Sequence, residues 1–148
     1  MKITAAIASI VIILFSACKK EENVYPAAAP VIAVLSASPD TITEFRDSLV
    51  IEISYEDQNG DLGNADPDIK DLEIKDARLS QPDYYHVIPL SPEGTTLFIN
   101  GTLRIVLPPQ FRLGTAPHEQ TTFTIRLRDQ NGAWSEPVDT DQIVITEQ

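Results

Sequence analysis

Two stretches of the chain alternate between apolar and polar side chains, with Val50 as the one exception. Residues 49–56 and residues 123–128 both place an apolar side chain at every second position. A period of two is typical of β-strands that bury one face, because successive side chains point to opposite sides of a sheet. Shorter or weaker matches predict further strands at residues 31–35, 72–76, 84–89, 103–107 and 143–145. After Pro30, no window of ten residues shows the 3.6-residue period of an amphipathic helix.

Glycine and proline occur between these runs, for example at Gly60, Pro82, Pro92 and Gly114. About seven short strands separated by turn residues predict an all-β fold, an antiparallel immunoglobulin-like or fibronectin-like β-sandwich. Residues 31–148 are enough to bury one such core, so a single domain is expected. The Cys-Trp-Cys signature of antibody domains is absent from the sequence, which argues against a true immunoglobulin domain.

The pair Asn100-Gly101 lies inside an otherwise apolar run and has two interpretations. Asn-Gly favours a tight hairpin turn, which would divide the run into two strands. Alternatively, the pair marks a bulge or bend within one long strand. Because residues 97–107 are otherwise continuous, we expect the bulge or bend.

The first 17 residues have the pattern of a secretory signal peptide. Lys2 precedes residues 3–15, in which only Thr4 and Ser9 are not apolar. This stretch of about 13 residues is shorter than the roughly 18 or more that a membrane-spanning helix needs. A buried core helix is the alternative, but the stretch has no polar face. We therefore expect residues 1–17 to be removed during export.

The sequence Phe-Ser-Ala-Cys at residues 15–18 resembles a lipobox, where bacterial lipoproteins are diacylated on cysteine and cut before it. Ser16 and Ala17 are small, as that family requires, whereas Phe15 replaces the commonest residue, leucine. Cys18 is the only cysteine, so the chain can form neither an internal disulfide nor a multi-cysteine zinc site. The resemblance implies that acyl chains such as palmitate anchor Cys18 to a membrane. A free thiol is the alternative.

Lys19, Lys20, Glu21 and Glu22 follow the cysteine directly. This cluster resembles the surface-export signal of Bacteroidetes-type lipoproteins, which implies display on the outer face of the outer membrane. The alternatives are a simple solvated charge run and a periplasm-facing protein. Residues 18–30 contain prolines that disfavour a helix, so we expect an extended tether that reaches at most about 40 Å from the lipid.

The string Asp-Gln-Asn-Gly occurs twice, at residues 57–60 and 129–132, each time at the end of a strongly predicted strand. In a seven-stranded sandwich these strands would be the second and the sixth, so we expect the repeats to lie side by side at one pole. Two interpretations remain open. The carboxylates cap backbone N–H groups in Asx-type turns, or they bind a structural Ca²⁺, which prefers six to eight oxygen ligands. The candidate ligands are Asp57, Asn59, Asp61, Asp66, Asp68, Asp129 and Asn131, with Glu136 nearby.

The string departs from an EF-hand loop. Leu62 stands where that loop has its glycine, and Asp68 stands where it has a glutamate. No helices are predicted on either side of it. Any calcium bound here is therefore expected to tie loops together and not to act in catalysis.

Two further features have alternative interpretations. Trp134 follows the second repeat, and we expect it to plug the end of the core, whereas an exposed platform for a sugar is the alternative. Asp40-Thr41-Ile42 resembles the O-glycosylation acceptor of Bacteroidetes-type bacteria, which implies a modification site at Thr41. Ser48 has the same context but opens a strand, which makes it the weaker candidate.

The chain of 148 residues contains 11 Lys and Arg against 22 Asp and Glu, a formal net charge of −11. This acidity excludes nucleic acid as an expected partner, because phosphate binding needs a basic face. His86 and His118 are isolated, and neither a Gly-x-Ser-x-Gly nucleophile elbow nor a glycine-rich phosphate loop occurs. We therefore expect no catalytic activity.

The lipobox, the Lys-Glu cluster, the Asp-rich loop and the Asp-Gln-Asn-Gly-Ala-Trp-Ser segment at residues 129–135 together resemble small Bacteroidetes-type surface lipoproteins with one immunoglobulin-like domain. The resemblance implies a lipid-anchored binding or structural module of the outer membrane. An accessory subunit of an outer-membrane nutrient-uptake assembly, binding glycan or protein, is the alternative. The ligand and the oligomeric state do not follow from the sequence.

Overall fold

The structure is a computed structural model that describes residues 29–92 and 94–148. The predicted signal peptide, Cys18, the Lys19–Glu22 cluster and most of the predicted tether lie outside the described residues. Within those two ranges the chain forms strands and no helix. The strands are β1 (Val31–Ser38), β2 (Thr41–Thr43), β3 (Leu49–Asp57), β4 (Leu72–Asp76), β5 (Asp83–Tyr85), β6 (Ile99–Leu107), β7 (His118–Thr121), β8 (Phe123–Leu127), β9 (Val138–Asp139) and β10 (Ile143–Thr146).

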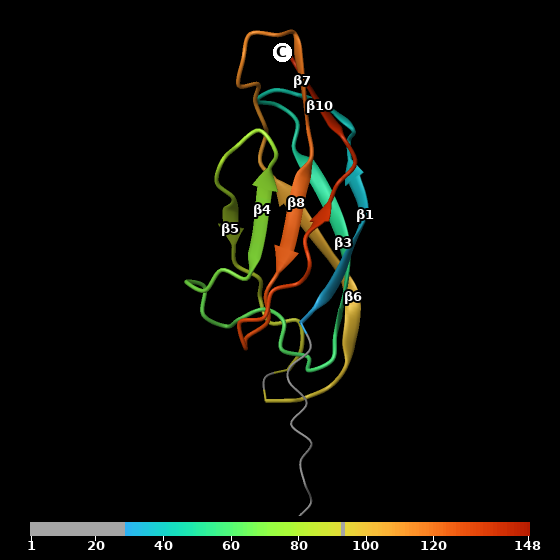
Figure 1. Cartoon of the computed structure of the whole chain (residues 1–148), viewed down its shortest axis with the longest axis vertical. Coiled ribbons are helices and arrows are strands. Elements are labelled where there is room, and N and C mark those ends of the chain that lie inside the picture. Colours follow the sequence, from blue (N-terminus) through green and yellow to red (C-terminus); the bar gives the residue numbers. More distant parts are fainter. Residues whose placement is uncertain (1–28, 93) are drawn as a thin grey trace, which may run out of the picture.

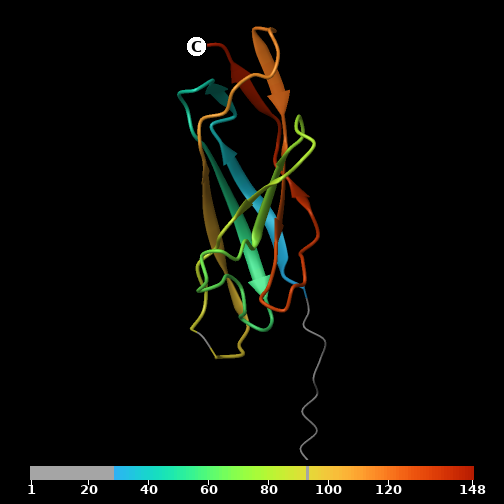
Figure 2. The same cartoon turned by 90° about the vertical axis from the view of Figure 1, so that its left-hand side faces the viewer.

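The strands form two main antiparallel sheets that pack over one core (Figures 1 and 2). One sheet has the order β1-β3-β6, and the other has the order β5-β4-β8-β9. A third small sheet, β2-β10-β7, joins β2 to the last strand of the chain. The predicted all-β sandwich is therefore confirmed.

The strand count exceeds the predicted seven because three short strands were not predicted. β7 precedes the predicted strand at residues 123–128, with Thr122 between them, and β9 precedes the predicted strand at residues 143–145. The short β2 was not predicted, and its pairing with β10 is parallel, with Thr41 opposite Val144. The sandwich is thus antiparallel apart from this one pair.

The predicted strand at residues 84–89 is wrong beyond Tyr85, where β5 ends. After that residue the backbone leaves β4 and bonds to the loop that follows β3. The carbonyl oxygen of Val87 accepts a hydrogen bond from the N–H of Asn64 at 2.8 Å. The N–H of Leu90 donates to the carbonyl oxygen of Leu62 at 3.0 Å. These loop contacts replace the expected strand pairing.

The core is built from the apolar side chains at alternate positions of residues 49–56 and 123–128. Leu49, Ile51 and Ile53 of β3 and Ile125 and Leu127 of β8 have no solvent exposure. Full burial of such a side chain stabilises the fold by about 1.5–3 kcal/mol. β3 and β8 therefore hold the two sheets together, and the loops leaving them start from fixed positions.

Asn100-Gly101 lies within β6, which is one continuous strand as expected. Its register with β3 is regular throughout, with Gly101 opposite Tyr55, so the predicted bulge is absent. The Tyr55 side chain lies directly over this glycine: a Cβ at residue 101 would lie 2.6 Å from the Tyr55 hydroxyl oxygen. The bulge of this sheet lies in β1, where the register shifts between Val34 and Ser36.

The two ends of the sandwich are made by different loops (Figure 1). β1 begins at one end, where Val31 pairs with Glu56, and the loops 58–71 and 128–137 lie there too. We term this end the N-terminal pole. The opposite end holds the C-terminus and the loops 44–48 and 108–117, and we term it the C-terminal pole.

Candidate functional site

The two Asp-Gln-Asn-Gly repeats lie side by side at the N-terminal pole, as the sequence predicted. Leu62 and Asp129 form a backbone bridge. The N–H of Gln130 donates to the carbonyl oxygen of Asp61 at 3.0 Å. The amide Nδ2 of Asn131 donates to the Asp61 Oδ2 at 2.5 Å. The loops after β3 and β8 therefore form one structural unit.

Each repeat begins with an aspartate that closes its own loop. The Oδ2 of Asp57 accepts hydrogen bonds from the N–H groups of Gly60 at 2.6 Å and Asp61 at 3.1 Å. The Oδ1 of Asp129 accepts one from the N–H of Ala133 at 2.7 Å. These are the contacts expected of Asx-type turns, and each aspartate uses only one of its two oxygens to make them.

Four carboxylates of the N-terminal pole each keep one buried oxygen without a hydrogen-bond partner. These atoms are Oδ1 of Asp57, Oδ1 of Asp61, Oδ2 of Asp71 and Oδ2 of Asp129. Asp57 and Asp129 are only 2% and 1% exposed. Asp71 is paired with Arg128 at 3.2 Å, whereas none of the ion pairs found between described residues involves Asp57, Asp61 or Asp129. A buried, unpaired carboxylate oxygen is costly, so this arrangement is unusual for a native loop.

The charges of these carboxylates act on one another. Burial, followed by the like charges of Asp57 and Asp129, raises the pKa of Asp61 to about 6. The three groups therefore lie close enough to repel. At neutral pH Asp61 is still mostly ionised, and the pole holds negative charge that no described cation balances.

The remaining predicted ligands do not join this cluster. Asp66 and Asp68 are exposed and form a local turn, in which the Asp66 Oδ1 accepts from the N–H of Asp68 at 2.9 Å. Asn59 is half-buried, and Glu136 is exposed. Of the seven predicted ligands, the structure brings together Asp57, Asp61, Asp129 and Asn131. No three His, Cys, Asp or Glu side chains in the described part of the chain already surround a common metal position.

Trp134 does not plug the core, so that expectation is wrong. It is half-buried on the outer side of β8, with the guanidinium groups of Arg126 and Arg128 at 4.9 Å and 5.2 Å from the ring centroid. The two arginines cover the ring, so it is not an open sugar platform either. Among the residues of these loops, Leu62 joins the core instead and is 1% exposed.

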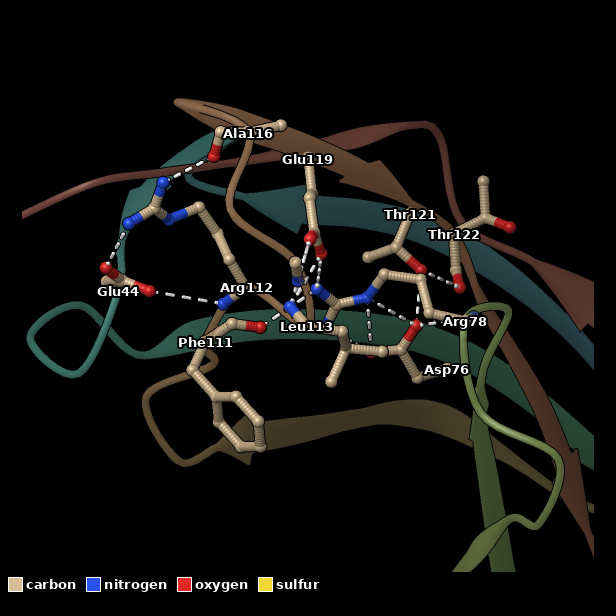
Figure 3. Close-up of polar contacts among 11 residues, drawn as sticks. Glu44, Asp76, Arg78, Phe111, Arg112, Leu113, Ala116, Glu119, Thr121 and Thr122 are labelled. Atoms are coloured by element: carbon tan, nitrogen blue, oxygen red, sulfur yellow. Dashed lines mark hydrogen bonds and ion pairs between the residues drawn. The ribbon is translucent and has the colours of Figure 1, made fainter.

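Two arginines form ion pairs with carboxylates of the C-terminal pole (Figure 3). The Arg78 guanidinium lies 2.6 Å from the Asp76 carboxylate and 2.9 Å from that of Glu119. Arg112 pairs with Glu44 at 2.7 Å. Burial acts to raise the pKa of Asp76, but hydrogen bonds from Arg78 and Thr121 hold this pKa below its usual value. Each of these three carboxylates therefore has an arginine partner.

The same side chains hold the 108–117 loop in place. The Arg78 Nη1 donates to the carbonyl oxygen of Phe111 at 2.9 Å. The Glu119 carboxylate accepts from the N–H groups of Leu113 at 2.9 Å and Gly114 at 2.6 Å. Charged hydrogen bonds of this kind are stronger than neutral ones, so the loop is fixed although it belongs to no sheet.

The fixed loop presents an aromatic pair to solvent. The rings of Phe45 and Phe111 stack with centroids 5.7 Å apart and planes 3° from parallel. They are 66% and 48% exposed, and we term them the aromatic patch. Phe45 has φ 59°, a left-handed conformation that is unfavourable for a bulky residue. Its N–H donates to the carbonyl oxygen of Gln110 at 2.9 Å, which locks this conformation.

The sequence did not reveal the aromatic patch. Phe45 lies between Glu44 and Arg46, and Phe111 lies between Gln110 and Arg112, outside every alternating stretch. Single phenylalanines among charged residues were the only signal. Their meeting depends on a contact between two loops that are 66 positions apart.

The other predicted positions lie at separate places on the surface. Thr41 is exposed on β2, and Ser48 is exposed before β3. His118 is exposed at the start of β7, and the Nδ1 of His86 lies 3.1 Å from the carbonyl oxygen of Ile69. The structure therefore brings neither histidine to the acidic cluster of the N-terminal pole.

No protein-family model, curated protein or solved structure matches this chain. In residues 29–92 and 94–148 there is no helix with the length and apolar character needed to cross a lipid bilayer. The function is therefore inferred from the sequence and from the geometry of the two poles.

Proposed function

We propose that this protein is a non-catalytic binding module of the bacterial cell envelope, anchored by lipid at Cys18 and displayed on the outer face of the outer membrane. One observation carries the proposal: β1 begins at one pole, and the aromatic patch lies at the other. An anchor that precedes Val31 turns the N-terminal pole toward the membrane. The aromatic patch then faces away from it.

The aromatic patch has the properties of a binding surface. Phe45 and Phe111 expose large apolar faces in a fixed orientation, and the backbone of Phe45 is held in an unfavourable conformation to do so. Local strain that does not serve packing is concentrated at functional positions. Flat, exposed aromatic faces suit the apolar face of a sugar ring, so a glycan is the favoured ligand class.

Absence of catalysis is part of the proposal. Glu119 and Glu44, whose arginine partners hold or belong to the loop of Phe111, are engaged by Arg78 and Arg112. Their pKa values are lowered: hydrogen bonds from Arg112 lower that of Glu44, and hydrogen bonds from Leu113, Gly114 and Arg78 lower that of Glu119. A carboxylate held ionised in this way is a poor proton donor at neutral pH.

The anchor is tested by the mass of the native protein. We expect cleavage before Cys18 and added mass for a diacylglyceryl group, whereas Cys18→Ser should keep its signal peptide and gain no lipid. Surface display is tested by protease treatment of intact cells, in which replacing residues 19–22 with alanine should protect the protein. Retention of Met1 without added lipid would remove the anchor from the proposal.

Binding is tested with an array of neutral and acidic polysaccharides. Phe45→Ala and Phe111→Ala should each weaken binding about tenfold, which corresponds to about 1.4 kcal/mol. Phe98→Ala is the matched control, because Phe98 is also exposed but lies next to β6 at the opposite pole. Equal binding by all three variants, or no binding by the wild type, would contradict the assigned surface.

A further inference from the structure

We propose that Asp57, Asp61 and Asp129 form a calcium-binding site at the N-terminal pole. The site would join the loop after β3 to the loop after β8. It is separate from the aromatic patch at the C-terminal pole and does not depend on the binding function proposed for that patch.

The first argument is that each of the three carboxylates uses only one of its two oxygens as a hydrogen-bond acceptor. Asp57 and Asp129 use one oxygen to close their own loops, and Asp61 uses one to accept from Asn131. The second oxygen of each is buried and has no partner. Three aspartates from two loops thus present three free oxygen atoms at the same pole.

The second argument is the missing positive charge. Unpaired carboxylates with the burial of Asp57 and Asp129 strongly destabilise a folded protein. The neighbouring Arg128 bonds to Asp71 at 3.2 Å and covers Trp134, so its charge is directed elsewhere. One shared proton would still leave two negative charges. A bound divalent cation satisfies all three oxygens at once.

The ligand chemistry favours calcium. All the available donors are oxygen atoms, which excludes metals that need cysteine or histidine. Asn131 adds an amide oxygen if its terminal group rotates, and a cavity of about 250 Å³ beside Asp61 has room for water ligands. Ca²⁺ accepts six to eight oxygens in flexible geometry, whereas Mg²⁺ requires a nearly ideal octahedron. The three aspartates do not yet surround one point, so binding has to draw the two loops together.

Calcium bound here would fix the place where β1 enters the domain. Val31 pairs with Glu56, the neighbour of Asp57. Extracellular calcium modules bind with Kd values of about 10⁻⁴–10⁻³ M. A site of this affinity fills outside the cell and stays empty in the cytosol, so the ion would complete the fold after export.

The test uses the full-length protein in mild detergent, stripped with EDTA and then titrated with CaCl₂. Calorimetry should show one Ca²⁺ per chain. Saturating Ca²⁺ should raise the Tm by about 5 °C or more. No heat and no change in Tm for the stripped protein would overturn the proposal, and an equal response to MgCl₂ would overturn the assignment to calcium.

Asp61→Asn gives the sharper test, because its two expected effects have opposite signs. In EDTA the variant should have a higher Tm than the wild type, because one of three like charges is removed without a change of shape. In saturating Ca²⁺ it should have the lower Tm, because an ionised ligand is lost. A variant that stays less stable in EDTA, or one that keeps the full calcium response, would overturn the proposal.

Asp68→Asn is the matched control for this experiment. Asp68 lies in the same loop and carries the same charge, but it is exposed and outside the cluster. It should retain the wild-type calcium response. Asp57→Asn is less informative, because Asp57 also accepts two backbone hydrogen bonds and the variant risks misfolding.

Discussion

Both poles of this sandwich contain clustered acidic side chains, but they differ in whether basic side chains pair with the carboxylates. At the C-terminal pole, Arg78 and Arg112 reach the carboxylates of Asp76, Glu119 and Glu44. At the N-terminal pole, Arg128 pairs with Asp71, but Asp57, Asp61 and Asp129 keep free oxygens and pair with no described basic side chain.

The pKa values of the two poles move in opposite directions as a result. Burial acts to raise the pKa of both Asp76 and Asp61. Contacts with Arg78 bring the pKa of Asp76 below its usual value, whereas the like charges of Asp57 and Asp129 raise that of Asp61 further. Burial alone therefore does not decide how a carboxylate behaves. What decides it is whether the chain supplies a cation to that carboxylate: Arg78 reaches Asp76, whereas no described cation pairs with Asp61.

Removing the internal cation should have the largest effect. Arg78→Met leaves the Asp76 carboxylate buried without its charged partner, and we expect a loss of about 3–5 kcal/mol in unfolding free energy. Denaturant titration measures it. Arg46→Ala is the control, because its pair with Asp47 is exposed and should change stability by less than about 1 kcal/mol. Similar losses in both variants would contradict the role of Arg78.

The two repeats can be compared through their glycines. A Cβ at Gly60 would lie 2.6 Å from the carbonyl oxygen of Leu97, whereas nothing lies within 4 Å of one at Gly132. Both residues have positive φ, 69° and 90°. Gly60→Ala should therefore cost about 2 kcal/mol or more, and Gly132→Ala about 1 kcal/mol. Thermal unfolding of the pair checks the order, and equal losses would show that the loop after β3 can relax.

The strain at the aromatic patch predicts a smaller difference. Phe45→Gly and Phe45→Ala both remove the ring, but only glycine relieves the unfavourable φ. We expect the glycine variant to be more stable than the alanine variant by about 1 kcal/mol, measured by denaturant titration in parallel. If alanine is equally stable, the backbone at residue 45 is not strained.

The dependence of folding stability on pH should be the smallest effect, and its sign differs between the two poles. In metal-free protein, folded Asp61 has a pKa near 6 against an ordinary 3.8, so the folded state binds more protons between these values. Stability should therefore rise as the pH falls from 7 toward 4. The pKa of Asp76 is lowered instead, so its contribution is present above about pH 4 and is lost at lower pH.

Tm measured in EDTA across this range tests both signs. Asp61→Asn should abolish the rise between pH 7 and pH 4 and keep the loss below pH 4. A wild-type Tm that falls steadily from pH 7 downward would contradict the difference between the poles.

The fold was largely predictable because alternation along a strand is a local property. The two alternating stretches became β3 and β8, whose apolar faces make the centre of the core. The prediction failed at residues 86–89, where the chain pairs with a loop that no periodicity marks. The position of Trp134 was predicted wrongly for a related reason, because its partners are arginines on the outer face of β8.

The sequence by itself determined the strands and the two matching Asp-Gln-Asn-Gly turns, because period-two patterns and turn residues act over a few neighbouring positions. Only the tertiary structure decided which charges are balanced. Arg78 meets Glu119 across 41 positions, and Asn131 meets Asp61 across 70. Contacts over such separations depend on how the sheets pack and where their loops end, and no local pattern carries that information.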